Sequence, residues 1–275
     1  MRSKRSEYGV LHGFLRLLAF AIALLWAGLM MLLRRPRTLR ERSLWKQRMC
    51  LLIARCMGME IDVIGRVPVS GMIVSNHLSY LDAVVFGALV PAVFVAKAEV
   101  RRWPLVGWLT ASGGTIFLQR DNVRMVADVN RRLVTTMAQG TPTMIFPEGT
   151  TTGATDPLPF HPALFEPAVR GRLAVWPSAL AYSIDGRSAD VPERVCYWAD
   201  MTFVPHLVKL MRQRNVRAVV RFADGPVMAA SRTEAAALSQ SAVTAMLHDG
   251  LRHTSMPRAA SVRVHQAAAA QTLQH

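Results

Sequence analysis

The stretch MIVSNHLSYLD, residues 72–82, starts with an apolar run and ends with a histidine and an aspartate in His-x4-Asp spacing. The run Met72–Ser75 predicts a buried strand, which places His77 in the loop at the carboxyl end of that strand. Active sites of parallel sheets lie at such ends. If Asp82 sits in the first turn of the next helix, its carboxylate can hold one imidazole tautomer and stabilise the imidazolium. The pair therefore predicts a general base at a strand end.

A purely structural role for the same aspartate is the alternative. Ser79 and Asp82 have the spacing of a helix capping box, with Asp in place of the usual Glu. A histidine and an aspartate at this spacing also arise by chance, so the pair alone is a weak signal.

On both sides of this stretch the chain alternates between strand-like and helix-like patterns. Short apolar runs predict strands, and longer runs with apolar residues three and four positions apart predict helices. The predicted strands are 60–64, 72–75, 92–96, 115–118, 143–146, 173–181 and 216–222, and the predicted helices are 80–89, 100–111, 123–138, 162–168, 203–212 and 233–250. Such alternation is typical of an α/β fold with a largely parallel sheet flanked by helices.

The amino-terminal segment is predicted to attach the chain to a membrane. Residues 17–33 carry no charge, and this length approaches the roughly 20 apolar residues that cross a bilayer. Leu11 and Phe14 extend the run if Arg16 reaches the interface. Arginines follow, rather than a small-residue cleavage site, which favours a retained anchor over a signal peptide. Because both flanks are basic, spanning the bilayer and lying in it with both ends cytoplasmic stay open as alternatives.

A basic segment follows this anchor. Apolar and basic residues at helical spacing over 44–57 predict an amphipathic helix that lies on the membrane or on the domain. The cations predict contact with anionic head groups on the cytoplasmic side. They are Arg34, Arg35, Arg37, Arg40, Arg42, Lys46 and Arg48. The expected location is the inner (cytoplasmic) membrane, with the catalytic domain on its cytoplasmic face.

Composition narrows the class of partner. The net charge of +15 over 275 residues favours anionic partners. No zinc finger, RNA-binding aromatic motif or leucine zipper accompanies that charge, so no nucleic-acid partner is expected. The cysteines, Cys50, Cys56 and Cys196, are odd in number and irregularly spaced, which excludes a disulfide framework and gives no metal-ligand pattern.

Three further segments place distinctive residues at or near predicted strands. Arg120 follows the strand 115–118, and FPEGT (146–150) ends the strand 143–146. Val175-Trp176-Pro177 breaks the predicted strand 173–181 near its middle. Each segment alone is ordinary turn chemistry, but together with His77 they predict one site at one edge of the sheet.

In this order the four segments resemble the four motifs of the glycerolipid acyltransferase superfamily, which includes the lysophosphatidic acid acyltransferases. His77 and Asp82 match its His-x4-Asp signature, and residues 114–120, 146–150 and 175–177 resemble its other motifs. The resemblance covers about residues 65–182, and four ordered motifs are far more specific than one. It implies a glycerolipid acyltransferase domain over 59–253, between the membrane anchor and basic helix over 1–58 and a tail over 254–275 whose Ala- and Gln-rich composition predicts disorder.

The resemblance implies transfer of a fatty acyl chain from acyl-CoA or acyl carrier protein to the free hydroxyl of a lysolipid. The expected acceptor is 1-acyl-glycerol-3-phosphate, which would become phosphatidic acid. His77 would act as general base, oriented by Asp82, and such assistance accelerates a reaction about 10²–10⁴-fold. Neither a metal nor a bound cofactor is implied; the partners are membrane lipids, the acceptor and the acyl donor.

The same motifs imply a set of substrate-binding positions. Arg120, with Lys97, would bind the acceptor's anionic head. Backbone N–H groups near Gly113 and Gly114, or near Gly149, would hold the oxyanion. Glu148 is expected to hold Arg120 or an acceptor hydroxyl. The full set is Lys97, Gly114, Arg120, Glu148, Gly149, Thr150 and Pro177.

Two departures bear on the acceptor. The second motif commonly has an acidic residue where this chain has Gln119, and the third commonly has an arginine where it has Thr151. Residues 160–165, 197–201 and 205–207 resemble the lyso-ornithine-lipid branch, whose acceptor carries no phosphate. Lyso-ornithine lipid is therefore the alternative acceptor. A non-catalytic binder of lipid head groups is the alternative from another functional class.

Overall fold

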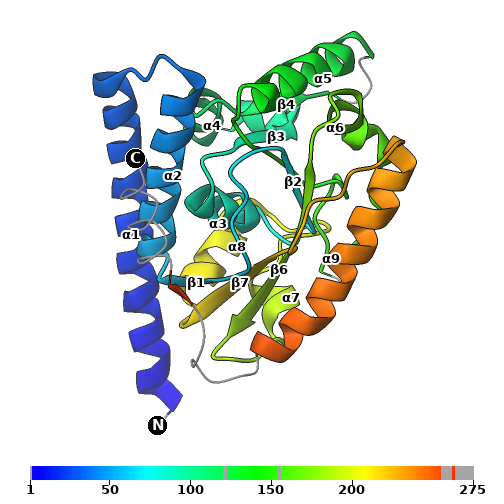
Figure 1. Ribbon diagram of the computed structural model, residues 1–275. Coiled ribbons are helices and arrows are strands. Elements are labelled where there is room, and N and C mark those ends of the chain that lie inside the picture. Colours follow the sequence, from blue (N-terminus) through cyan, green and yellow to red (C-terminus); the bar gives the residue numbers. More distant parts are fainter. Residues whose placement is uncertain (1, 104, 120–122, 154–155, 255–261, 264–275) are drawn as a thin grey trace.

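The computed structural model describes residues 2–103, 105–119, 123–153, 156–254 and 262–263, which form one twisted sheet with helices on both faces (Figure 1). Within this described part the sheet has eight strands. They are β1 (Met59–Ile64), β2 (Met72–Ser75), β3 (Val93–Lys97), β4 (Ile116–Leu118), β5 (Thr143–Ile145), β6 (Val175–Ile184), β7 (Val216–Phe222) and β8 (Val262–Arg263).

The helices alternate with these strands along the chain. The α-helices are α1 (Arg2–Arg34), α2 (Leu39–Cys56), α3 (Leu81–Leu89), α4 (Val106–Ser112), α5 (Val123–Ala138), α6 (Glu166–Arg170), α7 (Val191–Arg194), α8 (Phe203–Met211) and α9 (Arg232–Thr254). Two 3₁₀ helices, η1 (Ala98–Arg102) and η2 (Pro162–Phe165), precede α4 and α6.

The strand order is β4-β3-β5-β2-β6-β7-β1-β8. The five strands from β4 to β6 run parallel to their neighbours, β6 pairs antiparallel with β7, and β7 is parallel to β1. The expected α/β fold with a largely parallel sheet is confirmed. Carboxyl ends of the parallel strands meet at one edge of the sheet, where polar loops converge.

Alternating side chains of the strands pack into two hydrophobic cores, one on each face of the sheet. Ile73 faces the core under α2, α3 and α8, whereas Met72 and Val74 face the core under α5, α6 and α9. In β6, Leu180 and Tyr182 face the first core, and Ala181 faces the second. This alternation follows from the two-residue period of a strand, and it explains why the buried strands read as nearly continuous apolar runs.

Pro177 does not break its strand, contrary to the sequence-based expectation. It lies inside β6, in register with Val74 of β2. A proline has no N–H to donate to a ladder, and the antiparallel ladder with β7 begins one residue later, at Ser178. The strand therefore continues to Ile184.

Helix α1 lies along the domain rather than projecting from it (Figure 1). Gly13 contacts Arg212 beside α8, and Gly28 contacts Trp108 of α4. These contacts are about 22 Å apart along the helix at 1.5 Å per residue. The Arg16 guanidinium donates to the Gln213 carbonyl and so turns toward the domain, not toward a membrane interface as the sequence suggested.

The outward face of α1 is an uncovered apolar stripe. Residues 10–34 have a mean hydropathy of 2.2 in their most apolar window, and only 22% of that window is buried. This is the one described helix long and apolar enough to cross a membrane. The exposed stripe comprises Val10, Leu11, Phe14, Leu15, Leu18, Ile22, Leu25, Trp26, Leu29, Leu32 and Leu33.

Helix α2 begins at a full capping box. The Thr38 hydroxyl accepts from the Glu41 N–H, and the Glu41 carboxylate accepts from the Thr38 N–H. Lys46, grouped by the sequence with the membrane-facing cations, is instead buried, with its ammonium 4.6 Å from the centre of the Phe94 ring. Its burial lowers its pKa to about 8.

Candidate active site

The loop that follows β2 is fixed to the neighbouring strand β6 by one amide side chain. Asn76 donates from Nδ2 to the Leu180 carbonyl at 2.9 Å, and its Oδ1 accepts from the Leu180 N–H at 2.8 Å. Asn76 and Leu180 are both buried. The last residue of β6 that pairs with β2 is Ser178, and β6 continues for six residues beyond it. This extension of β6 packs against the loop that follows β2.

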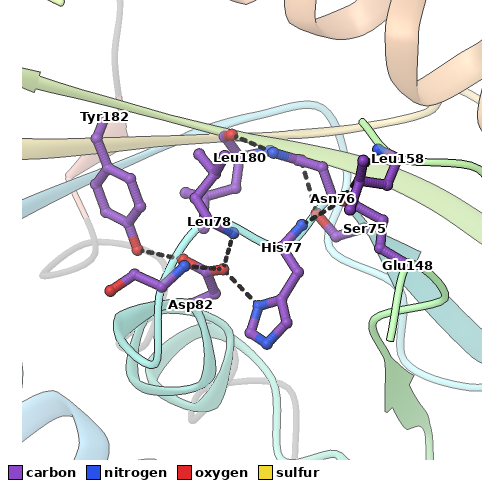
Figure 2. A network of polar contacts seen from close by, with 10 residues as sticks. Ser75, Asn76, His77, Leu78, Asp82, Glu148, Leu158, Leu180 and Tyr182 are labelled. Carbon is purple, nitrogen blue, oxygen red and sulfur yellow. Dashed lines mark hydrogen bonds and ion pairs between the residues drawn. The ribbon is translucent and has the colours of Figure 1, made fainter. Parts of the chain in front are cut away.

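His77 and Asp82 form the expected pair. The imidazole Nδ1 lies 2.7 Å from Asp82 Oδ2, and the Asp82 side chain is fully buried whereas 20% of the His77 side chain is exposed. A carboxylate only accepts hydrogen bonds, so Nδ1 carries the proton and Nε2 keeps its lone pair. Nε2 points away from the polar network (Figure 2), which is the orientation a general base needs.

Asp82 also binds the backbone just ahead of α3, but the full capping box that the sequence suggested does not form, because the Ser79 hydroxyl makes no hydrogen bond. Its Oδ2 accepts from the backbone N–H groups of Leu78 and Ser79 at 2.6 and 2.9 Å. The loop thereby supplies two N–H donors that stabilise the carboxylate charge. These contacts fix the carboxylate at the position from which it binds the imidazole.

Tyr182, which the sequence did not single out, completes the hydrogen bonding of Asp82 (Figure 2). Its buried hydroxyl donates to Asp82 Oδ1 at 2.8 Å. Burial and the neighbouring Asp82 carboxylate raise the pKa of Tyr182 well above its usual range, so the phenol keeps its proton. Tyr182 lies 100 residues from Asp82, and no local spacing signals such a contact.

Phe146, at the end of β5, sets the plane of the imidazole. The two rings stack with centroids 4.1 Å apart and planes 10° from parallel. Phe146 belongs to the FPEGT segment, which the sequence placed at this edge of the sheet. Stacking on one face and the Asp82 contact on Nδ1 leave the His77 ring little freedom to rotate.

Glu148 binds the backbone of the loop that carries His77, a contact that the sequence did not suggest. Its Oε1 accepts from the His77 N–H at 2.6 Å and its Oε2 from the Leu158 N–H at 2.9 Å. The side chain is only 2% exposed. Burial raises the pKa of Glu148 to about 7, although both backbone donors act in the opposite direction.

The remaining predicted positions divide into two groups. Lys97 ends β3 with its side chain exposed, and Gly149 and Thr150 follow β5, so all three lie at the same carboxyl edge of the sheet as His77. The Gly149 N–H donates to the Phe146 carbonyl at 3.1 Å within the turn. Arg120 lies outside the described residues.

Gly114 lies at the opposite edge of the sheet. Helix α4 carries the chain back from the end of β3 to the start of the parallel strand β4, so Gly113 and Gly114 precede the amino end of β4. Their N–H groups donate to Leu109 and Ala111 carbonyls at 2.9 and 3.1 Å. The predicted oxyanion site at these glycines and the predicted substrate contact at Gly114 thus lie at the edge opposite His77, and both stay predictions.

The arrangement suits proton abstraction from a group placed beside His77 Nε2. An oriented imidazole, a buried carboxylate and a second carboxylate that holds the loop supply a general base without a nucleophilic side chain. In the described part of the chain, no three His, Cys, Asp or Glu side chains are placed to bind a metal ion.

Comparisons with known proteins agree with this chemistry. The family model described as Acyltransferase matches residues 61–181. The chain is 34% identical over 230 residues to the lyso-ornithine lipid O-acyltransferase of Pseudomonas aeruginosa, across 82% of this chain and 85% of that protein. It is 33% identical over 134 residues to the 1-acyl-sn-glycerol-3-phosphate acyltransferase of Neisseria gonorrhoeae, across 46% of this chain and 52% of that protein.

A solved structure shares the fold. The crystal structure of the 1-acyl-sn-glycerophosphate (LPA) acyltransferase PlsC from Thermotoga maritima superposes with a TM-score of 0.65 at 17% identity. The match covers 89% of this chain and 97% of that one.

Proposed function

Because the chain belongs to the acyltransferase family, we propose that it transfers a fatty acyl chain from a thioester donor to the free hydroxyl of lyso-ornithine lipid, with His77 as general base. The observation that carries this proposal is the His77–Asp82 pair, whose Nε2 faces away from the buried network. A non-catalytic binder of lipid head groups would not need an imidazole held both by Asp82 at Nδ1 and by Phe146 on one face.

The proposed acyl transfer needs one group that accepts a proton from the acceptor hydroxyl and then donates it to the leaving thiolate. His77 Nε2 takes the proton of the acceptor hydroxyl while its oxygen attacks the thioester carbonyl, and the Asp82 carboxylate stabilises the imidazolium. The new C–O ester bond forms as the C–S bond breaks, and the imidazolium returns its proton to the departing thiolate. The donor is acyl-CoA or an acyl carrier protein, and the acyl transfer itself is shared with both named relatives.

Two observations favour lyso-ornithine lipid over 1-acyl-glycerol-3-phosphate as acceptor. The lyso-ornithine enzyme matches this chain over most of both lengths, whereas the glycerol-phosphate enzyme matches about half of each. Thr151 replaces the arginine common in the third motif, and with it the cation that would meet a phosphate. Lyso-ornithine lipid instead carries a carboxylate, for which Lys97 and Arg120 remain candidate partners.

The contacts of α1 favour attachment in the plane of one leaflet, the inner membrane's cytoplasmic side. A helix crossing the bilayer upright would draw α4 and α8, which contact it near Gly28 and Gly13, into the hydrocarbon. Lying flat, α1 buries its uncovered apolar stripe among the acyl chains and leaves the packed face on the domain.

The test is turnover by the full-length protein purified in detergent. Lyso-ornithine lipid and 1-acyl-glycerol-3-phosphate are each supplied with acyl-CoA or acyl carrier protein, and the acylated lipid is measured. We expect His77→Ala to lower kcat by about 10²–10⁴-fold. The matched control is His248→Ala, because His248 forms an exposed pair with Asp156 at 3.0 Å that catalysis does not need. Equal rates for His77→Ala and wild type would refute the mechanism.

A second variant tests the acceptor. We expect wild type to prefer lyso-ornithine lipid and Thr151→Arg to raise kcat/KM for 1-acyl-glycerol-3-phosphate, because the new guanidinium can bind its phosphate. A wild-type preference for the phosphorylated acceptor would instead assign the glycerol-phosphate reaction to this enzyme.

A further inference from the structure

A groove of about 580 Å³ lies at the turn between α1 and α2, away from the catalytic loop. Its walls are Arg35, Arg37 and Arg42 on one side and Ala111 and Ser112, at the end of α4, on the other. The volume falls within the range of about 300–1,000 Å³ that small-molecule sites occupy.

The groove stands at the sheet edge opposite His77. Ser112 ends the helix that returns the chain to the amino end of β4, and β4 is parallel to β3, β5 and β2. A molecule in the groove is thus separated from His77 by the depth of the sheet, so the groove cannot hold the reacting acceptor.

The charge of the groove is positive and held in place by the backbone. Arg35 Nε donates to the Leu32 carbonyl and Arg42 Nε to the Pro36 carbonyl, each at 3.3 Å. Each contact uses one of the five N–H donors of a guanidinium. The nearby Glu41 carboxylate accepts from the backbone N–H groups of Arg37 and Thr38, and it caps α2. The groove is therefore suited to a phosphate or a similar anion.

The uncovered stripe of α1 leads directly to this groove. Leu29, Leu32 and Leu33 are 46%, 60% and 66% exposed, and Arg35 follows two residues later. A bilayer that covers these leucines brings its head-group layer to the α1–α2 turn. This continuity favours a lipid over a soluble anion or a protein as the occupant.

We propose that the groove binds the phosphate head group of an anionic phospholipid that is not a substrate. This rests on the proposed membrane attachment. If α1 lies in the membrane plane, the domain can still rotate about the α1 axis. A head group bound in the groove, at the carboxyl end of α1, would restrict that rotation. The domain then keeps one orientation on the leaflet that supplies the lysolipid.

The experiment compares two charge-matched double variants of the full-length protein. The groove pair is Arg37→Gln with Arg42→Gln. The control pair is Arg40→Gln with Arg48→Gln, two exposed arginines on other faces of α2 at about 100° per residue. Binding to vesicles of phosphatidylcholine alone, or of phosphatidylcholine with phosphatidylglycerol, is measured by sedimentation.

We expect the groove pair to bind the phosphatidylglycerol vesicles about 25-fold more weakly than wild type, from about fivefold per arginine at an anionic surface. The control pair should lose less than about fivefold, and both pairs should bind pure phosphatidylcholine as wild type does. Equal losses in the two pairs would overturn the proposal, because they would report general surface charge and no site.

Turnover in detergent micelles separates this proposal from the proposed reaction. The groove pair should keep the wild-type rate, because its arginines lie at the edge opposite His77. A large loss of micelle turnover in the groove pair alone would also overturn the head-group assignment. If the wild-type protein transfers no acyl chain, the proposed reaction is refuted. The vesicle comparison still tests whether the groove binds a head group.

Discussion

Replacing Tyr182 by phenylalanine removes a single hydroxyl from the hydrogen-bond network around Asp82. In the wild-type protein Asp82 Oδ2 accepts three hydrogen bonds, whereas Oδ1 accepts the Tyr182 hydroxyl at 2.8 Å. The Asp82 side chain is fully buried, so water cannot replace the lost donor. A hydrogen bond to a charged group contributes about 1.5–3 kcal/mol, and we expect the free energy of unfolding to fall by about 2 kcal/mol.

The same change should slow catalysis without weakening substrate binding. Asp82 keeps its contact with His77, but its Oδ1 loses the hydrogen bond from Tyr182. If about 1 kcal/mol of the energy of this hydrogen bond stabilises the transition state, its loss lowers kcat about fivefold. KM should stay at the wild-type value, because Tyr182 is 2% exposed and lies behind Asp82, away from the acceptor.

The assay is steady-state turnover in detergent, with thermal or urea unfolding of the same preparation. Tyr80→Phe is the matched control, because the Tyr80 hydroxyl contacts His206 at 3.0 Å and not Asp82. It should change kcat less than about twofold. If Tyr182→Phe loses stability yet keeps the kcat of the Tyr80→Phe control, the phenol only packs the core and our reasoning about Asp82 is refuted.

Three further changes test other parts of the structure. Asp82→Asn should lower kcat by about 10³–10⁴-fold, because an amide cannot hold the same tautomer; a loss below tenfold in the turnover assay would contradict the pair. The pKa of Glu148 rises from 4.5 to about 7 on folding, so the folded protein holds a proton that the unfolded chain loses above pH 4.5. The contribution of this proton to the free energy of unfolding is complete below pH 4.5 and is lost as the pH rises toward 7. Glu148→Gln should therefore abolish a decline of about 3 kcal/mol in unfolding free energy between pH 5 and 8, measured by urea unfolding, and an unchanged slope would exclude Glu148 as its source. Leu25→Asn with Leu29→Asn should weaken sedimentation with phosphatidylcholine vesicles at least about 100-fold, since each leucine contributes about 1.5–3 kcal/mol on burial; Leu238→Asn, on the exposed face of α9, should have no effect, and equal binding by all three proteins would exclude the α1 stripe as the contact.

Much of the secondary structure follows from local pattern. The strands β2 and β7 and the helix α5 begin and end at the predicted residues. The predicted helix 100–111 is instead a 3₁₀ helix, Ala98–Arg102, and a short α-helix, Val106–Ser112, and Leu105 before the second helix has a positive φ of 56°. A periodic apolar pattern indicates which face is buried, and it does not register such a backbone turn.

The His77–Asp82 pair was predictable because its two members are close in sequence and lie at a strand end. The FPEGT segment indicated the edge of the sheet at which Glu148 lies, but its contacts with the N–H groups of His77 and Leu158 join residues 71 and 10 positions away and have no local signal. Gly114 lies at the edge opposite His77 because it precedes β4, so the motif that contains it begins a full strand length away from the His77 loop.

The sequence by itself determined the alternation of strands and helices, the apolar amino-terminal helix and the histidine–aspartate pair, because each depends on residues within about one turn or one strand of one another. Only the tertiary structure decided that β6 extends past β2, that Tyr182 thereby reaches Asp82, and that α1 lies along the domain with an arginine groove at its end. These contacts join residues from distant parts of the chain. Strand register and helix packing determine these contacts, and the spacing of apolar residues in a single sequence indicates neither of them.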